Sequence, residues 1–117
     1  MIVIAGYLDY ADRGARDAIL EAGADLQRAT RKDEPGCEAY CFSADPTDDG
    51  RIRVHELWAD EAALTAHFEH ANFVAMREVF HLFPRTGGEV RKYRCDLSEP
   101  VNDDDGTYRA DFFTASD

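Results

Sequence analysis

The chain has 117 residues, the length of one domain, with 13 Lys and Arg against 24 Asp and Glu and a formal net charge of −11. This acidity argues against DNA, RNA and anionic membranes as partners, because phosphate groups are bound by clustered Lys and Arg. No stretch approaches the roughly 18 apolar residues of a membrane span, and the first ten residues lack the basic region of a secretory signal. The odd count of three cysteines does not suit a secreted disulfide framework, so a cytoplasmic protein is expected.

Residues 2–9 are predicted to form a strand that is apolar on both faces. Ile2 and Ile4 lie on one face, and Val3 and Ala5 lie on the other. A strand that is buried on both faces needs two covering layers.

A long helix is expected next, beginning at Asp12 or Gly14 and ending at Pro35-Gly36, a pair that stops helices. Its apolar residues recur at helical spacing: Ala15, Ala18, Ile19, Ala22, Leu26 and Ala29.

Residues 37–44 and 51–58 are predicted as two strands of a hairpin, because the segment between them, DPTDDG, is rich in turn-forming residues. Asp60 can cap a helix that begins at Glu61. This helical pattern continues to about Phe83, with a break expected near residues 70–72.

Pro84 and Gly87-Gly88 are expected to end that helix, and residues 89–96 are predicted as a last strand. The element order is then β-α-β-β-α-β, the ferredoxin-like α+β arrangement, in which one antiparallel sheet carries helices on one side. A homodimer that stacks two such sheets would bury the second face of the first strand.

The chain divides into a domain at residues 1–97 and an acidic, turn-prone tail at residues 98–117. One interpretation of the tail is a frayed, solvated terminus. The favoured one is an arm whose aromatic residues, Tyr108, Phe112 and Phe113, dock on the sheet or on the partner subunit.

An ordered set of residues resembles the antibiotic biosynthesis monooxygenase family, which includes cofactor-free quinol and anthrone oxygenases and haem-degrading monooxygenases. The resemblance covers roughly residues 2–97 and implies a dimeric α+β barrel. The residues that carry it are Glu34-Pro35-Gly36-Cys37, Tyr40, Glu56-Leu57-Trp58, Ala63-Leu64, Ala66-His67 and Phe73.

His67 is the leading candidate for a catalytic residue. It lies three residues after Leu64, on the helix side expected to face the sheet, and it matches the histidine of the family's Ala-x-x-His stretch. A partly buried histidine can remove a phenolic or activated C–H proton near neutral pH. The alternative is a core histidine that is hydrogen-bonded to a backbone carbonyl.

Glu56 and Trp58 are two residues apart and so share one strand face, together with Ile52 and Val54. A carboxylate in that apolar row must be paired or protonated. Trp58 is either an aromatic wall for a flat substrate or plain core.

Further substrate contacts are expected from residues of the same cavity, Tyr40, Tyr7 and Phe73, and less so from His55. Asn72 can donate a hydrogen bond to a substrate oxygen, and Arg77 can stabilise a phenolate or enolate. For Asn72 and Arg77 the alternative is a solvated helix face.

No cofactor and no functional metal are expected. Haem-degrading relatives use an Asn on the first strand, a Trp on a helix and a haem-ligating His. Counted by register from Trp58, these positions are occupied here by Tyr7, His67 and Arg77, so the iron ligand is missing. The segment from Asp45 to Gly50 imitates a calcium loop, but it is flanked by strands rather than helices. The pair His67 and His70 lacks a carboxylate at metal-ligand spacing.

These observations favour a homodimeric, cofactor-independent monooxygenase that acts on a small hydroxylated aromatic and dioxygen. His67 would deprotonate the substrate, Trp58 and Tyr40 would pack against it, and Asn72 and Arg77 would orient it, while Glu56 positions a neighbouring donor. The rival hypothesis is a non-catalytic, dimeric ligand-binding or stress-related protein of the same fold.

Overall fold

The computed structural model describes residues 1–114 and has the ferredoxin-like α+β architecture that the sequence predicts. The sheet is four-stranded and antiparallel, in the order β2-β3-β1-β4. Its strands are β1 (Ile2–Tyr10), β2 (Cys37–Ala44), β3 (Arg51–Trp58) and β4 (Arg85–Arg94).

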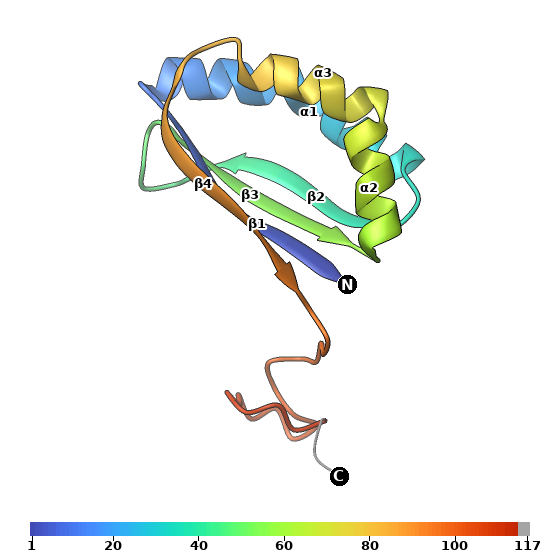
Figure 1. Ribbon diagram of the computed structural model, residues 1–117. Helices are drawn as coiled ribbons and strands as arrows, with labels where there is room; N and C mark the ends of the chain where they lie inside the picture. Colours follow the sequence, from blue (N-terminus) through green and yellow to red (C-terminus); the bar gives the residue numbers. More distant parts are fainter. Residues whose placement is uncertain (115–117) are drawn as a thin grey trace.

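Three helices cover one face of this sheet and leave the other face bare, as Figure 1 shows. They are α1 (Arg13–Asp33), α2 (Glu61–Glu69) and α3 (Ala71–Phe80). The Asp12 side chain accepts a hydrogen bond from the Ala15 N–H, and the Asp60 side chain accepts one from the Ala63 N–H. Both caps satisfy amide groups that the first helical turn leaves without an intrahelical partner.

The expected break in the second helical segment lies at His70, which ends α2 and caps α3. Its backbone has an extended conformation, and its N–H donates to the His67 carbonyl. Its ring Nδ1 accepts a hydrogen bond from the Asn72 N–H. One residue therefore turns the chain from α2 into α3, and His67 lies on the last turn before that bend.

The core lies between the helices and the inner face of the sheet. On β1, Ile2, Ile4 and Leu8 point into it, whereas Val3 and Ala5 lie on the bare outer face and are half-buried. The two-sided apolar character predicted for the first strand is confirmed, and no second layer formed by residues 1–114 covers its outer side.

The last strand begins earlier than expected. Gly87 and Gly88 were predicted to lie outside it, but β4 starts at Arg85 and contains both. At Gly88 the backbone has φ +144°, and a Cβ there would lie 2.8 Å from the Tyr7 carbonyl oxygen. This glycine thus permits a close approach of β4 to β1 rather than ending a helix.

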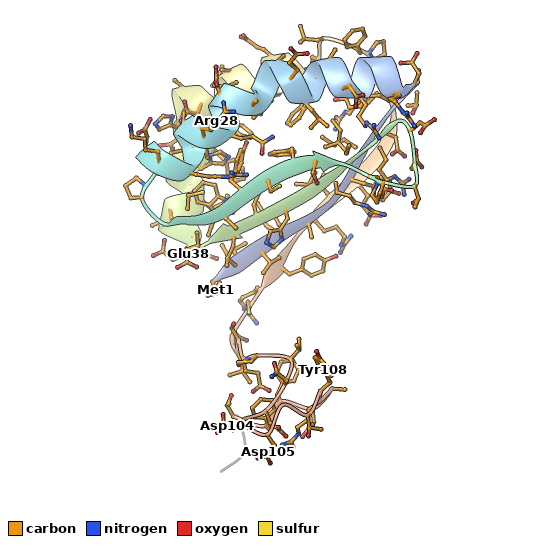
Figure 2. The ribbon with its side chains drawn as sticks, turned by 180° about the vertical axis from the view of Figure 1, so that it is seen from behind. Met1, Arg28, Glu38, Asp104, Asp105 and Tyr108 are labelled. Carbon is orange, nitrogen blue, oxygen red and sulfur yellow. The ribbon has the colours of Figure 1, made fainter. Side chains whose placement is uncertain are left out.

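The tail after β4 leaves the body of the molecule, as Figures 1 and 2 show. It forms its own small loop through a bridge between Asn102 and Tyr108 and through Glu99, which accepts hydrogen bonds from the N–H groups of Phe113 and Thr114. Tyr108 is 83% exposed and Phe112 is 62% exposed. Among the described residues of the arm, Phe112 lines a shallow pocket with Val3 and Tyr93 at the end of the outer sheet face, while Tyr108 stays in solvent. Docking of the arm on a partner subunit stays a prediction.

Candidate functional site

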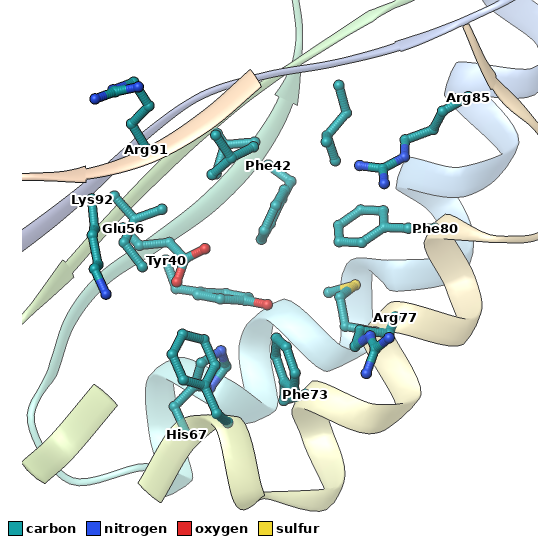
Figure 3. A pocket seen from close by; sticks show the side chains of 16 residues that line it. Tyr40, Phe42, Glu56, His67, Phe73, Arg77, Phe80, Arg85, Arg91 and Lys92 are labelled. Carbon is teal, nitrogen blue, oxygen red and sulfur yellow. The ribbon is translucent and has the colours of Figure 1, made fainter. Parts of the chain in front are cut away.

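A pocket of about 410 Å³ opens between the inner face of the sheet and the helices α2 and α3. It exists because α1 packs against β2 while no helix packs more than sparsely against β4. Figure 3 shows its aromatic and charged lining. The lining residues are Ile4, Leu8, Tyr40, Phe42, Val54, Glu56, His67, Phe68, Phe73, Met76, Arg77, Phe80, Arg85, Val90, Arg91 and Lys92.

His67 lies on the wall of this pocket and is held by a carboxylate. Its Nδ1 is 2.7 Å from Glu34 Oε1, and both residues are buried. The other oxygen of Glu34 accepts a hydrogen bond of 3.1 Å from Asn72 Nδ2 and lies 4.0 Å from His70 Nδ1. Glu34, His67 and Asn72 therefore form a connected polar network inside an otherwise apolar region.

Glu34 reaches α2 because of the turn that follows α1. Pro35 and Gly36 reverse the chain, and Gly36 has φ +83°, a left-handed conformation that favours glycine. A Cβ at Gly36 would lie 2.5 Å from the Ala63 Cβ, so the turn packs directly on the first part of α2. The Gly36 carbonyl also accepts a hydrogen bond of 2.9 Å from the Ala59 N–H.

Aromatic rings surround the imidazole of His67. The Trp58 ring lies 4.4 Å from it between centroids, the Phe73 ring 5.2 Å and the Tyr40 ring 5.5 Å. Burial lowers the pKa of His67, while the Glu34 carboxylate acts in the opposite direction. The imidazole is therefore held as a neutral base near pH 7.

Glu56 is a second titratable group of the pocket. Its Oε1 accepts a hydrogen bond of 2.9 Å from Trp58 Nε1–H. Burial raises the pKa of Glu56 to about 7, against the lowering effect of the Trp58 hydrogen bond and with a further rise from the Glu34 charge. The environment thus lowers the pKa of His67 and raises the pKa of Glu56, and such opposite shifts are typical of acid–base sites.

The structure brings most of the predicted site residues into one place. Tyr40, Glu56, His67, Phe73 and Arg77 all line the pocket. Burial also raises the pKa of the Tyr40 phenol, so that group stays protonated at neutral pH.

Four predicted residues lie elsewhere, which corrects the sequence prediction: Tyr7, Trp58, Asn72 and the less favoured His55, which is exposed on the outer face of β3. Tyr7 is on the outer face of β1 with the Arg51 guanidinium 3.9 Å above its ring, because odd and even residues of a strand face opposite ways. Trp58 is 0% exposed and supports His67 and Glu56 from behind rather than walling the pocket. Asn72 does not line the pocket; its side chain contacts Glu34.

Two groups of site residues escaped the sequence analysis. Glu34 belonged to the quoted Glu-Pro-Gly motif, and a carboxylate directly before a helix-ending turn was the signal that could have drawn attention to it. Arg85 and Lys92 lie on β4 and reach the pocket through the pairing of that strand with β1. No local pattern signals this placement, because it depends on strand register.

Within residues 1–114, no group of three or more His, Cys, Asp or Glu side chains is placed to hold a metal ion. The segment from Asp45 to Gly50 forms the predicted hairpin turn, in which Asp45 accepts a hydrogen bond from the Thr47 N–H and pairs with Arg53. None of the helices described there combines the length and apolar character that crossing a membrane requires.

Comparison with known proteins agrees with the fold. The antibiotic biosynthesis monooxygenase family model matches residues 1–79, and the chain belongs to this family. A crystal structure of a candidate antibiotic biosynthesis monooxygenase from Deinococcus radiodurans is similar with a TM-score of 0.74 and 20% identity, covering 86% of this chain and 97% of that one. Another structure, of an antibiotic biosynthesis monooxygenase, has a TM-score of 0.69 and 28% identity, covering 83% and 100%.

A curated relative from Synechocystis, the uncharacterized protein sll1783, is 40% identical over 42 residues. The match spans 36% of this chain and 29% of that protein. It adds no functional information, so the chemistry has to be argued from the pocket itself.

Proposed function

We propose that this protein is a cofactor-independent monooxygenase for a small hydroxylated aromatic of the quinol, naphthol or anthrone type. The observation that carries the proposal is the buried imidazole of His67, held by Glu34 on the wall of a largely aromatic pocket. An electron-rich aromatic anion can itself reduce dioxygen, so the protein has to deprotonate, orient and desolvate its substrate.

The hydrogen bond to Glu34 determines which nitrogen of His67 is the base. A carboxylate only accepts hydrogen bonds, so the proton of the neutral imidazole lies on Nδ1 and Nε2 carries the free lone pair. A substrate proton then passes to Nε2, and the Glu34 carboxylate stabilises the imidazolium that forms. Asn72 Nδ2 holds the second oxygen of Glu34 and so acts as a positioning residue.

The redox balance closes without a further reductant for a substrate of the anthrone type. His67 takes one proton from the ring CH2, and the resulting carbanion reduces dioxygen and forms a C–O bond, which gives a hydroperoxide on protonation. Loss of the second C–H proton with cleavage of the O–O bond leaves a C=O group, and the expelled hydroxide takes up a proton to form water. All four electrons that dioxygen accepts come from the substrate carbon.

The pocket suits such a flat apolar molecule. Its size falls in the range of small-molecule sites, and rings of Tyr40, Phe42, Phe73 and Phe80 line it. Phe42 and Phe80 pack with centroids 4.9 Å apart, which forms a continuous aromatic wall. Such a wall excludes water from the reacting anion.

The proposal includes a homodimer formed through the bare face of the sheet. Val3, Ala5 and Leu57 are half-buried there, and Tyr93 is 51% exposed beside them on the same face. Stacking two such faces would bury this apolar surface. Leu57→Lys places a charge within this apolar surface. Light scattering after size exclusion should show monomers for this variant and dimers for the unaltered protein. Dimers of unchanged stability in the variant would contradict the proposed interface.

Oxygen uptake by metal-stripped protein, measured with chelator over a panel of quinols, naphthols and anthrones, tests the activity. We expect turnover above the autoxidation blank for at least one substrate. His67→Ala should abolish that turnover while the protein keeps its fold and its ligand binding.

The rival function is non-catalytic ligand binding in the same pocket. Both oxygens of Glu34 have hydrogen-bond partners, His67 and Asn72, and this arrangement also suits a histidine whose role is purely structural. Ligand binding without uptake across the whole panel, or uptake that survives His67→Ala, would support this rival.

A further inference from the structure

The pocket reverses the charge balance of the chain. Of the 13 Lys and Arg residues, four line it, whereas of the 24 Asp and Glu residues one described residue, Glu56, does. The four cations are Arg77 on α3 and Arg85, Arg91 and Lys92 on β4. A strongly acidic protein that gathers positive charge around one opening creates a local field that attracts anions.

Three of these cations have no acidic partner in the part of the chain that the structure describes. Arg77, Arg85 and Lys92 form no ion pair there, whereas Arg13 pairs with Asp49 at 2.6 Å and Arg53 with Asp45 at 2.7 Å. Arg91 differs from the three, because its guanidinium lies 3.5 Å from Glu89 and points away from the pocket in Figure 3. The unpaired positive charge that lines the pocket therefore comes from Arg77, Arg85 and Lys92.

The three side chains frame the aromatic interior. Figure 3 shows Arg77 and Arg85 on the side of Phe80, with Lys92 on the opposite side of the pocket. The Arg77 guanidinium carbon lies 5.8 Å from the centre of the Phe73 ring, one of the rings that line the interior. A ligand whose rings fill the interior therefore has a cation near its edge on either side.

We infer that the pocket selects an aromatic anion, a fused-ring compound that carries an acidic substituent such as a carboxylate. The rings would pack among Tyr40, Phe42 and Phe80, and the acidic group would lie at the mouth, within reach of Arg77 and Arg85 or of Lys92. This inference rests on the proposed function because it takes the same pocket as the substrate site, and it names the substrate class more narrowly.

The chemistry of the cations supports an acidic group rather than a neutral oxygen. A guanidinium donates paired N–H groups that match a carboxylate, and such charge-assisted hydrogen bonds are about twice as strong as neutral ones. An exposed ion pair contributes little on its own, but three unpaired cations around a low-dielectric pocket act together on one anion.

Binding of matched probes tests the inference directly. Titration calorimetry on the full chain at pH 7 and low salt would compare 2-naphthoate with its neutral analogue 2-naphthamide. We expect 2-naphthoate to bind about ten-fold more tightly, and this preference to shrink at about 0.5 M salt, where exposed charges are screened.

Charge-removing variants assign that preference to the pocket. Arg85→Gln and Lys92→Gln should each reduce the naphthoate preference about three-fold while naphthamide binding stays the same. Arg28→Gln is the matched control, since it removes the same charge outside the pocket. Arg28 is an exposed residue of α1 that pairs with Asp25, and it is labelled in Figure 2. Equal affinities for the two probes, a preference that only Arg28→Gln removes, or binding of neither probe would overturn the inference.

Its failure can be told apart from failure of the proposed function. A naphthoate preference without any oxygen uptake would contradict the monooxygenase and leave the anion site standing. Oxygen uptake on neutral quinols with no naphthoate preference would contradict the anion site and leave the monooxygenase standing.

Discussion

On the helix-covered face of the sheet, Glu56 is buried with the Trp58 indole as its hydrogen-bond donor and has no cation within ion-pair distance in residues 1–114. On the bare face, Asp9 accepts two hydrogen bonds, of 2.8 and 2.9 Å, from Arg51. Burial raises the pKa of Glu56 to about 7, whereas the hydrogen bond from Arg51 lowers that of Asp9.

This difference distinguishes groups that support the fold from groups that are kept for chemistry. The carboxylate of Asp9 is neutralised by its neighbour and contributes as an ordinary surface pair. Glu56 and His67 are retained in an apolar pocket although burial disfavours the charged form of each, a cost that points to function. The predictions below test this contrast between the two faces, beginning with the largest effect.

Removing the imidazole on the inner face should have the largest effect. His67→Ala is expected to lower the rate of oxygen uptake at least about 100-fold, because the substrate loses its general base. The matched control is His55→Ala, which removes an exposed histidine from the outer face of the same sheet. An oxygen electrode measures both variants, and a similar loss in the two would contradict the assignment of the base to His67.

Glu56→Gln should change the pH dependence of stability. Because the pKa rises from 4.5 to about 7 on folding, the folded state binds the extra proton, and the stabilisation present below pH 4.5 is lost as the pH rises through 7. The variant does not titrate, so its free energy of unfolding relative to the unaltered protein should increase by up to about 3 kcal/mol between pH 4.5 and 8. Urea unfolding at both pH values measures this, and a constant difference would show that Glu56 ionises normally.

Glu34→Gln should lower oxygen uptake about ten-fold and alter its pH profile, since a positioning group holds the base in its productive orientation. The Glu34 charge raises the pKa of His67, so its removal lowers that pKa further and moves the acidic limb of the profile to lower pH. A lower melting temperature with an unchanged profile would mean that Glu34 has a structural role alone.

Asp9→Asn, on the outer face, should have the smallest effect. The pair with Arg51 is partly exposed, so we expect a slight fall in melting temperature and unchanged oxygen uptake. The fall should disappear toward low pH, because a lowered pKa contributes stability that is lost as the carboxylate becomes protonated. A large loss of uptake would show that the outer face takes part in catalysis.

Local features of the sequence predicted most of the fold. The turn segment between residues 45 and 50, the cap at Asp60 and the break near residue 70 involve neighbours within a few residues, and each lies where the sequence placed it. The predicted start of β4 was wrong. Gly88 allows β4 to approach β1 closely and does not end the preceding helix.

The candidate site was predicted in part for the same reason. Helical spacing placed His67 on the side of its helix that faces the sheet, and strand alternation placed Glu56 in an apolar row, since side-chain direction follows from local backbone geometry. Which face of the sheet lines the pocket did not follow from the sequence. Periodicity does not reveal depth, so Trp58 was taken for a pocket wall although it is fully buried.

By itself, then, the sequence determined the order of the elements, the two apolar faces of β1 and the histidine on the inner side of α2. The tertiary structure alone decided that Glu34, 33 residues before His67, lies 2.7 Å from it, and that Arg85 and Lys92 reach the pocket. These contacts depend on how a helix-ending turn packs on α2 and on the register between β1 and β4. Periodicity describes the surroundings of a residue along its own element, whereas a site is assembled by packing between elements that are distant in the chain.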